Sequence, residues 1–138
     1  MFQDIETTIV GRIGGVIAGA PVLTTFDIAD FTEEGVARVA VQVRWMGFAV
    51  DSQNGGAAEL QHRFEVSVLV DSARGLDTER TAAVVGLGAI VERLLGFKVA
   101  PGRRLSLAGE TPPPDFDGMA MRLSVYFNVP AVISAAAS

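Results

Sequence analysis

The chain has 138 residues, of which 49% are hydrophobic, and its formal net charge is −5 at pH 7. This length suits one domain with a substantial core, and the negative charge argues against a general nucleic-acid binder. The chain has no cysteine, which excludes disulfides and thiolate chemistry, and no stretch reaches the roughly 18 apolar residues of a membrane span, so the apolar excess indicates surface buried between subunits.

The first expected element is an amphipathic helix over residues 2–18. Four isoleucines recur at every fourth position and share one helix face: Ile5, Ile9, Ile13 and Ile17. Three glycines lie opposite that face: Gly11, Gly15 and Gly19. Glycine inside a helix costs about 1 kcal/mol relative to alanine. Either another backbone approaches these glycines closely, or the helix ends near Gly14.

Two strands with one buried face each are expected next. In the first, four large apolar residues alternate with other residues: Val39, Val41, Val43 and Trp45. In the second, the expected buried residues are Phe64, Val66, Val68 and Val70, and the expected exposed residues are Arg63, Glu65 and Ser67. Residues 51–58, DSQNGGAA, are rich in turn formers and predict a long, mobile hairpin tip.

A long helix is expected from Thr78 to Leu95, with Asp77 as its N-cap and Gly96 just past its end. Its main apolar face is expected to be Val84, Leu87, Val91, Leu94 and Leu95. Further apolar residues lie off this face: Ala82, Val85 and Ala89. A helix that is apolar nearly all round is buried on more than one side, which indicates an assembly.

The C-terminal part predicts two more strands. Residues 104–108 predict a short strand, and residues 109–118, with three prolines, predict a second exposed loop. A long alternating strand follows from residue 119 to 129, and Pro130 ends it or places it at a sheet edge. The expected fold is α+β, with element order αββαββ and a largely antiparallel four-stranded sheet whose helices pack on one face. Residues 1–130 form the single domain, and residues 131–138 form a tail.

None of the possible chemical motifs meets the requirements of a reaction. The glycine-rich residues 11–19 follow no strand and lack the lysine of a phosphate loop. His62 is the only histidine and is expected at the surface, at a strand start. Residues 115–118, DFDG, lack the later ligands of a calcium loop. We therefore expect no catalytic residue, no metal and no cofactor, and a protein that is not an enzyme.

The outer face of the expected sheet collects four arginines: Arg38, Arg44, Arg63 and Arg122. These side chains could contact phosphate or an acidic partner, or they could simply be solvated beside Glu65. The two expected loops add four further candidates for partner contacts: Asn54, Gly55, Pro113 and Asp115.

With these elements placed, residues 61–129 resemble the small tail proteins of Mu-like phages and prophages, and through them the tail-terminator group. The resemblance rests on a strand HRFEVSVLV, an arginine–glycine loop, a helix RTAAVVGLGAIVERLLG, and strands RRLSLAG and MRLSVYFNV. The N-terminal helix DIETTIVGRI also fits.

The resemblance implies an α+β subunit that forms a homohexameric ring on the last ring of the tail tube. Such a ring stops tube polymerisation and presents a surface to the head connector. The implied partners are further copies of the chain, the tail-tube protein, the sheath protein and the head–tail connector, with DNA only passing through the lumen and no membrane. The implied location is the virion tail, and the host cytoplasm during assembly. The alternatives are another ring-forming particle component, such as a head–tail connector or a tail-tube subunit, and a small ligand-binding domain or enzyme.

Overall fold

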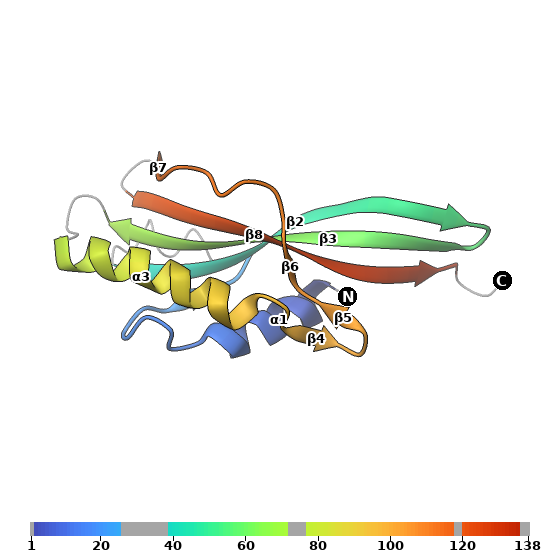
Figure 1. Ribbon diagram of the computed structural model, residues 1–138, viewed down its shortest axis with the longest axis horizontal. Helices are drawn as coiled ribbons and strands as arrows, with labels where there is room; N and C mark the ends of the chain where they lie inside the picture. The colour runs from blue at the N-terminus through green and yellow to red at the C-terminus, as the bar shows by residue number, and fades with distance from the viewer. Residues whose placement is uncertain (1, 26–38, 72–76, 118–119, 136–138) are drawn as a thin grey trace.

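The computed structural model describes residues 2–25, 39–71, 77–117 and 120–135 (Figure 1). One sheet forms its centre, and both helices, α1 (Phe2–Ile13) and α3 (Asp77–Leu94), lie on the same face of that sheet (Figure 1). We call this the inner face and the opposite one the outer face. Neither described helix meets the length and apolarity that crossing a membrane would require.

The central sheet is mixed. Its strand path is β1 (Val22–Leu23), β2 (Val39–Asn54), β3 (Ala57–Asp71), β8 (Ala120–Ser134) and β6 (Ser106–Leu107), and β7 (Asp115–Asp117) also pairs with β8. The pairing of β1 with β2 is parallel, and the others are antiparallel. A separate antiparallel ribbon consists of β4 (Lys98–Ala100) and β5 (Arg103–Arg104).

The predicted four-stranded antiparallel sheet with order αββαββ is therefore wrong. β1 runs parallel to β2, with Val22 opposite Val41, and the Val41 amide donates to the Pro21 carbonyl oxygen at 2.8 Å. Residues 96–117 supply four short strands to two sheets rather than one edge strand. Strands of two or three residues are too short to show an alternating pattern, so their partners are decided by tertiary packing.

The core lies between the helices and the inner sheet face. Its fully buried large side chains include Ile9, Ile13, Phe64, Ile90, Leu94 and Phe127. The predicted isoleucine stripe of the first helix and the predicted buried residues of β3 all belong to this core, which confirms both predictions. The helix itself ends at Ile13, and Gly15 has a φ of 78°. Of the two alternatives for the glycines, the one in which the helix ends near Gly14 is therefore correct.

The rotational setting of α3 differs from the prediction. Its buried residues are Ala83, Gly86, Ile90 and Leu94, whereas Val84 and Leu95, assigned to the main apolar face, are exposed. Gly96 follows the helix with a φ of 73°, as expected of a residue that ends a helix. The nearly uniform apolarity of α3 gave no preferred direction, so contacts with other elements decided which side faces the sheet.

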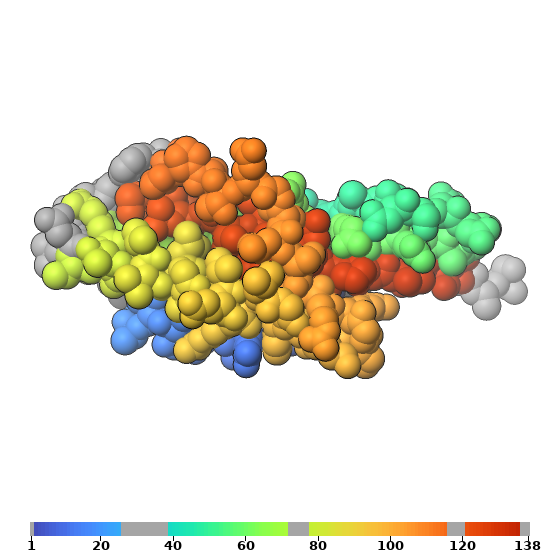
Figure 2. Space-filling model, viewed as in Figure 1, coloured from blue at the N-terminus to red at the C-terminus, as the bar shows by residue number. Residues whose placement is uncertain are grey.

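Three strands continue past the helices as an extended arm, which projects to one side in Figures 1 and 2. We define the arm as residues 46–61 of β2 and β3 together with residues 129–135. Only Gly55 and Gly56 separate β2 from β3, and Gly55 has a φ of 62°. The predicted long, mobile loop at residues 51–58 is thus wrong, because most of these residues are paired in strands. Residues 131–134, expected as a tail, continue β8 and pair with β3.

Candidate functional site

A buried carboxylate organises the polar residues of the outer sheet face. Glu65 on β3 is only 3% exposed, and its Oε1 lies 2.8 Å from Nη2 of Arg44 and 3.5 Å from Nη1 of Arg122. Tyr126 donates its hydroxyl hydrogen to Oε2 of Glu65 at 3.3 Å. Removing a carboxylate from water is costly unless it is paired and hydrogen-bonded, and these three side chains meet that need.

Arg122 extends the network across three strands. Its Nη1 donates to Oε1 of Gln42 at 3.0 Å and to Oγ of Ser67 at 3.3 Å. Ser67 in turn shares a hydrogen bond of 3.0 Å with Ser124. The side chains therefore connect β2, β3 and β8 on the face opposite α1 and α3.

Residues 112–115 lie beside this network. They line a shallow cavity of about 280 Å³ together with Glu65, Arg122, Ser124 and Tyr126. Two of the predicted loop candidates, Pro113 and Asp115, are thus brought next to one of the predicted sheet candidates. The pairing of β6 and β7 with different parts of β8 holds both ends of this segment.

The predicted exposed arginine face needs correction. Arg122 is buried and Arg44 is partly buried, and both contact Glu65. Glu65 and Ser67, expected to be exposed, are buried as well. Alternation along a strand distinguishes two faces but cannot show that a later segment covers one of them.

The other predicted candidates lie elsewhere. Arg63 is exposed, with its guanidinium 5.2 Å from the centre of the Tyr126 ring. Asn54 and Gly55 are exposed at the tip of the arm. Arg38 lies outside the described residues. The structure therefore groups Arg44, Arg122, Pro113 and Asp115 and separates the arm tip from them.

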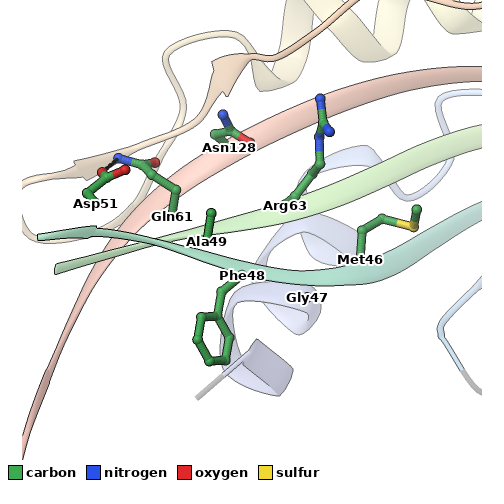
Figure 3. A pocket seen from close by; sticks show the side chains of 8 residues that line it. All are labelled: Met46, Gly47, Phe48, Ala49, Asp51, Gln61, Arg63 and Asn128. Atoms are coloured by element: carbon green, nitrogen blue, oxygen red, sulfur yellow. Dashed lines mark hydrogen bonds between the residues drawn. The ribbon is translucent and has the colours of Figure 1, made fainter. Parts of the chain in front are cut away.

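A second hollow lies on the outer face where the arm begins (Figure 3). Its volume is about 440 Å³, and Gln61, Arg63 and Asn128 line it (Figure 3). Gln61 Nε2 donates to Asp51 Oδ2 at 2.9 Å. An irregularity in the pairing of β2 with β3 at Met46 and Gly47 shapes this region. The hollow is open and polar, and its lining includes no serine, cysteine or histidine that could act as a nucleophile or base.

On the inner face at the same level, His62 is buried, with 1% of its surface exposed. Trp45 donates its indole N–H to Nδ1 of His62 at 3.0 Å, so Nδ1 is the unprotonated nitrogen and Nε2 carries the hydrogen. Nε2 is buried without a hydrogen-bond partner. Burial lowers the pKa of His62 below 6.5, and the nearby positive charges of the N-terminus and Arg103 lower it further.

The predicted surface position of His62 is therefore wrong. Phe2 of α1 stacks on Trp45 with ring centres 4.2 Å apart, and Phe48 meets the His62 ring edge-on at 5.8 Å. The sequence could have predicted this position, because His62 is two residues before the buried Phe64 in the same strand, and such residues point to the same face. That spacing predicts the inner face for both residues.

Exposed apolar side chains gather on two different surfaces. On α3, Val84 and Val85 are 61% and 68% exposed. On the arm, Phe48 and Val50 are 51% and 58% exposed. Single exposed apolar residues are common, whereas large contiguous apolar patches are typical of interaction sites.

No protein-family model matches the sequence, and no curated protein is significantly similar to it. Within the described residues, no three histidine, aspartate or glutamate side chains are grouped so that they could hold a metal ion.

Proposed function

We propose that this protein is a tail terminator of a phage-like particle: a homo-oligomeric ring that caps the tail tube, stops its polymerisation and joins it to the head connector. The observation that carries this proposal is the presence of two unlike apolar surfaces, one on the arm and one on α3. They lie toward opposite ends of the long axis (Figure 1). The resemblance of the strand–helix–strand pattern to the tail-terminator group supports the same conclusion.

Unlike surfaces favour a ring over a two-fold dimer. A two-fold contact buries the same patch on both subunits, whereas a head-to-tail contact joins one patch to a different one and closes into a ring when the rotation permits. The arm is suited to such a contact because its three strands are paired almost to their ends and its turn has only two residues. A paired arm loses little conformational entropy on binding, which favours association.

The proposed mechanism is stoichiometric and assigns no catalytic residue. A growing tube repeats one head-to-tail interface, so a cap must match that interface on one side without reproducing it on the other. The candidate tube-facing surface consists of residues 112–115, Arg63 and the arm tip at Asn54 and Gly55. These residues are exposed or partly exposed and lie on the outer face or at the end of the arm.

Tail length is the decisive measurement. In particles assembled without this protein, electron microscopy should show tails of variable, extended length that are not joined to heads. Adding the purified protein should restore uniform tails. Uniform tails with normal head joining in its complete absence would remove the terminator function.

Mass measurement of the purified protein is a second test. The proposal expects a closed ring, with a mass six times that of the 14.5 kDa chain. Open-ended stacks that lengthen with concentration would instead favour the alternative of a tail-tube subunit.

A further inference from the structure

Charge is segregated between the arm and the region where both helices end. The arm carries two carboxylates, Asp51 and Glu59, and no lysine or arginine. Both carboxylates are exposed, and their printed contacts are with neutral groups: Asp51 accepts from Gln61, and Glu59 accepts from Ser52. The outer face of the arm is thus acidic and exposes Val132 opposite Glu59, whereas Phe48 and Val50 are exposed on its inner face.

Five basic side chains lie together at the other site, which we call the basic ridge: Arg12, Arg93, Lys98, Arg103 and Arg104. Arg12 lies in the last turn of α1 and Arg93 in the last turn of α3, and the other three lie on the β4–β5 ribbon. All are exposed except Arg103, which is partly exposed. Within the part of the chain that the structure describes, no carboxylate forms an ion pair with any of the five.

Short contacts hold the ridge in place. Arg12 Nε donates to the carbonyl oxygen of Arg93 at 3.1 Å, and Arg104 Nη1 donates to that of Gly96 at 2.9 Å. Both bonds satisfy carbonyls at the C-terminus of α3, where positive charge is favourable. These two contacts explain why Arg12 and Arg104 are basic. They do not explain the positive charges of Arg93, Lys98 and Arg103.

Lys98 and Arg104 are directly opposite each other in the β4–β5 ribbon. Like charges at opposed positions of two strands destabilise the pairing. An acidic partner would relieve this repulsion. The ridge therefore has the charge of a docking surface for carboxylates.

The surface beside the ridge is apolar. Val84, Gly88 and Leu95 are exposed on α3 or just past its end, at spacings that place them along one helix side, and the exposed Glu92 is the one carboxylate among them. No atom lies within 4 Å of a Cβ built at Gly88, which leaves room for a partner side chain. A basic ridge continuous with an apolar stripe suits an acidic and apolar protein surface better than it suits a phosphate backbone.

We propose that the occupant is the arm of a second copy: Asp51 and Glu59 of one subunit contact the basic ridge of the next, while Val132, which lies opposite Glu59 on the same face of the arm, packs on the apolar side of its α3. This interface rests on the proposed ring and names the contact that closes it. Each subunit offers one arm and one ridge, so the contact repeats head to tail. Direct pairing of the free strand edges is disfavoured, because β2 is irregular at two places in the arm and β8 carries Pro130.

Charge swapping tests the proposal. Arg93→Glu/Lys98→Glu reverses two of the five ridge charges without touching the two arginines that donate to backbone carbonyls, and Asp51→Lys/Glu59→Lys reverses both charges of the arm. Each double variant alone should associate at least tenfold more weakly than the wild type in sedimentation and native mass measurements. An equimolar mixture of the two should recover oligomers, because in an alternating ring the new lysines of one arm face the new glutamates of one ridge, and the other interface is that of the wild type. The quadruple variant should assemble by itself.

Glu110→Lys is the matched control for a single reversal in the arm, because it makes the same charge change at an exposed residue outside both surfaces. It should leave assembly unchanged. Circular dichroism and thermal unfolding of every variant would separate loss of assembly from loss of fold.

The outcomes separate this interface from the proposed function. A wild-type protein that stays monomeric at all accessible concentrations would overturn both. If both double variants still formed rings, or if mixing them restored no oligomers, the proposed interface would be wrong, while the ring itself would stand. If ridge reversal left the ring intact but abolished binding to purified tail tubes or to a short DNA duplex, the occupant would be that partner and the proposal would be wrong.

Discussion

Ile17 packs directly against the backbone of α3 at Gly86. A Cβ built on Gly86 would lie 2.4 Å from Cδ1 and 2.5 Å from Cγ1 of Ile17, distances too short for real atoms. The contact joins the segment after α1 to the middle of α3, and both residues are buried. It explains why a glycine that weakens the helix is used on its buried side.

Gly86→Ala should therefore destabilise the protein relative to Gly88→Ala. The added methyl group overpacks the contact with Ile17, which costs about 1–3 kcal/mol, whereas alanine at the open Gly88 gains up to about 1 kcal/mol of helix propensity. Chemical denaturation of both variants measures the difference in free energy of unfolding. Equal stability of the two would show that Ile17 moves aside freely.

Glu65→Gln should destabilise the protein by about 3 kcal/mol, because it leaves the buried Arg122 without its carboxylate. Arg63→Met is the control: it removes an exposed guanidinium whose contact is with an aromatic ring and should cost less than about 1 kcal/mol. Denaturant midpoints of both variants give the comparison. A loss at Glu65 no larger than that at Arg63 would contradict the importance of the network.

Stability should fall as the pH drops below about 6.5. Burial lowers the pKa of His62 in the folded chain, so the unfolded chain takes up a proton first and becomes favoured as acidity increases. The effect should be absent above pH 7.5, where His62 is neutral in both states. His62→Asn keeps an acceptor for the Trp45 indole N–H but removes the titration, so its unfolding free energy should change less between pH 7.5 and 5.5. An unchanged slope would assign the pH dependence to other groups.

Arg63→Glu should weaken binding to purified tail tubes several-fold and leave the thermal midpoint nearly unchanged. Among the predicted outer-face arginines that the structure describes, Arg63 is the exposed one, so it is available to an acidic partner. Arg63→Lys keeps the charge and should bind nearly as well as the wild type. Normal binding by the glutamate variant would exclude Arg63 from the tube contact.

The residue pattern alone was enough to predict the inner face of β3, the isoleucine stripe of the first helix and the glycine that ends α3. Each depends on a local period or a single backbone angle: Phe64 and Val66 are two residues apart, Ile5 and Ile9 are four apart, and Gly96 can adopt a positive φ. Such features require no knowledge of distant segments.

Tertiary packing decided which neighbour covers each surface. The sequence predicted that Glu65 and Arg122 are exposed. Alternation along a strand separates two faces of a sheet, but it cannot show that a later segment of the chain covers one of those faces. The direction of α3 depended on Ile17, which is far from Gly86 in sequence, and the parallel pairing of Val22 with Val41 depended on a strand too short to have a period. Residues 51–56, DSQNGG, are typical of a loop, but pairing with β3 makes residues 51–54 part of β2 and leaves Gly55 and Gly56 as the turn, because hydrogen bonds to a neighbouring strand outweigh weak turn propensities.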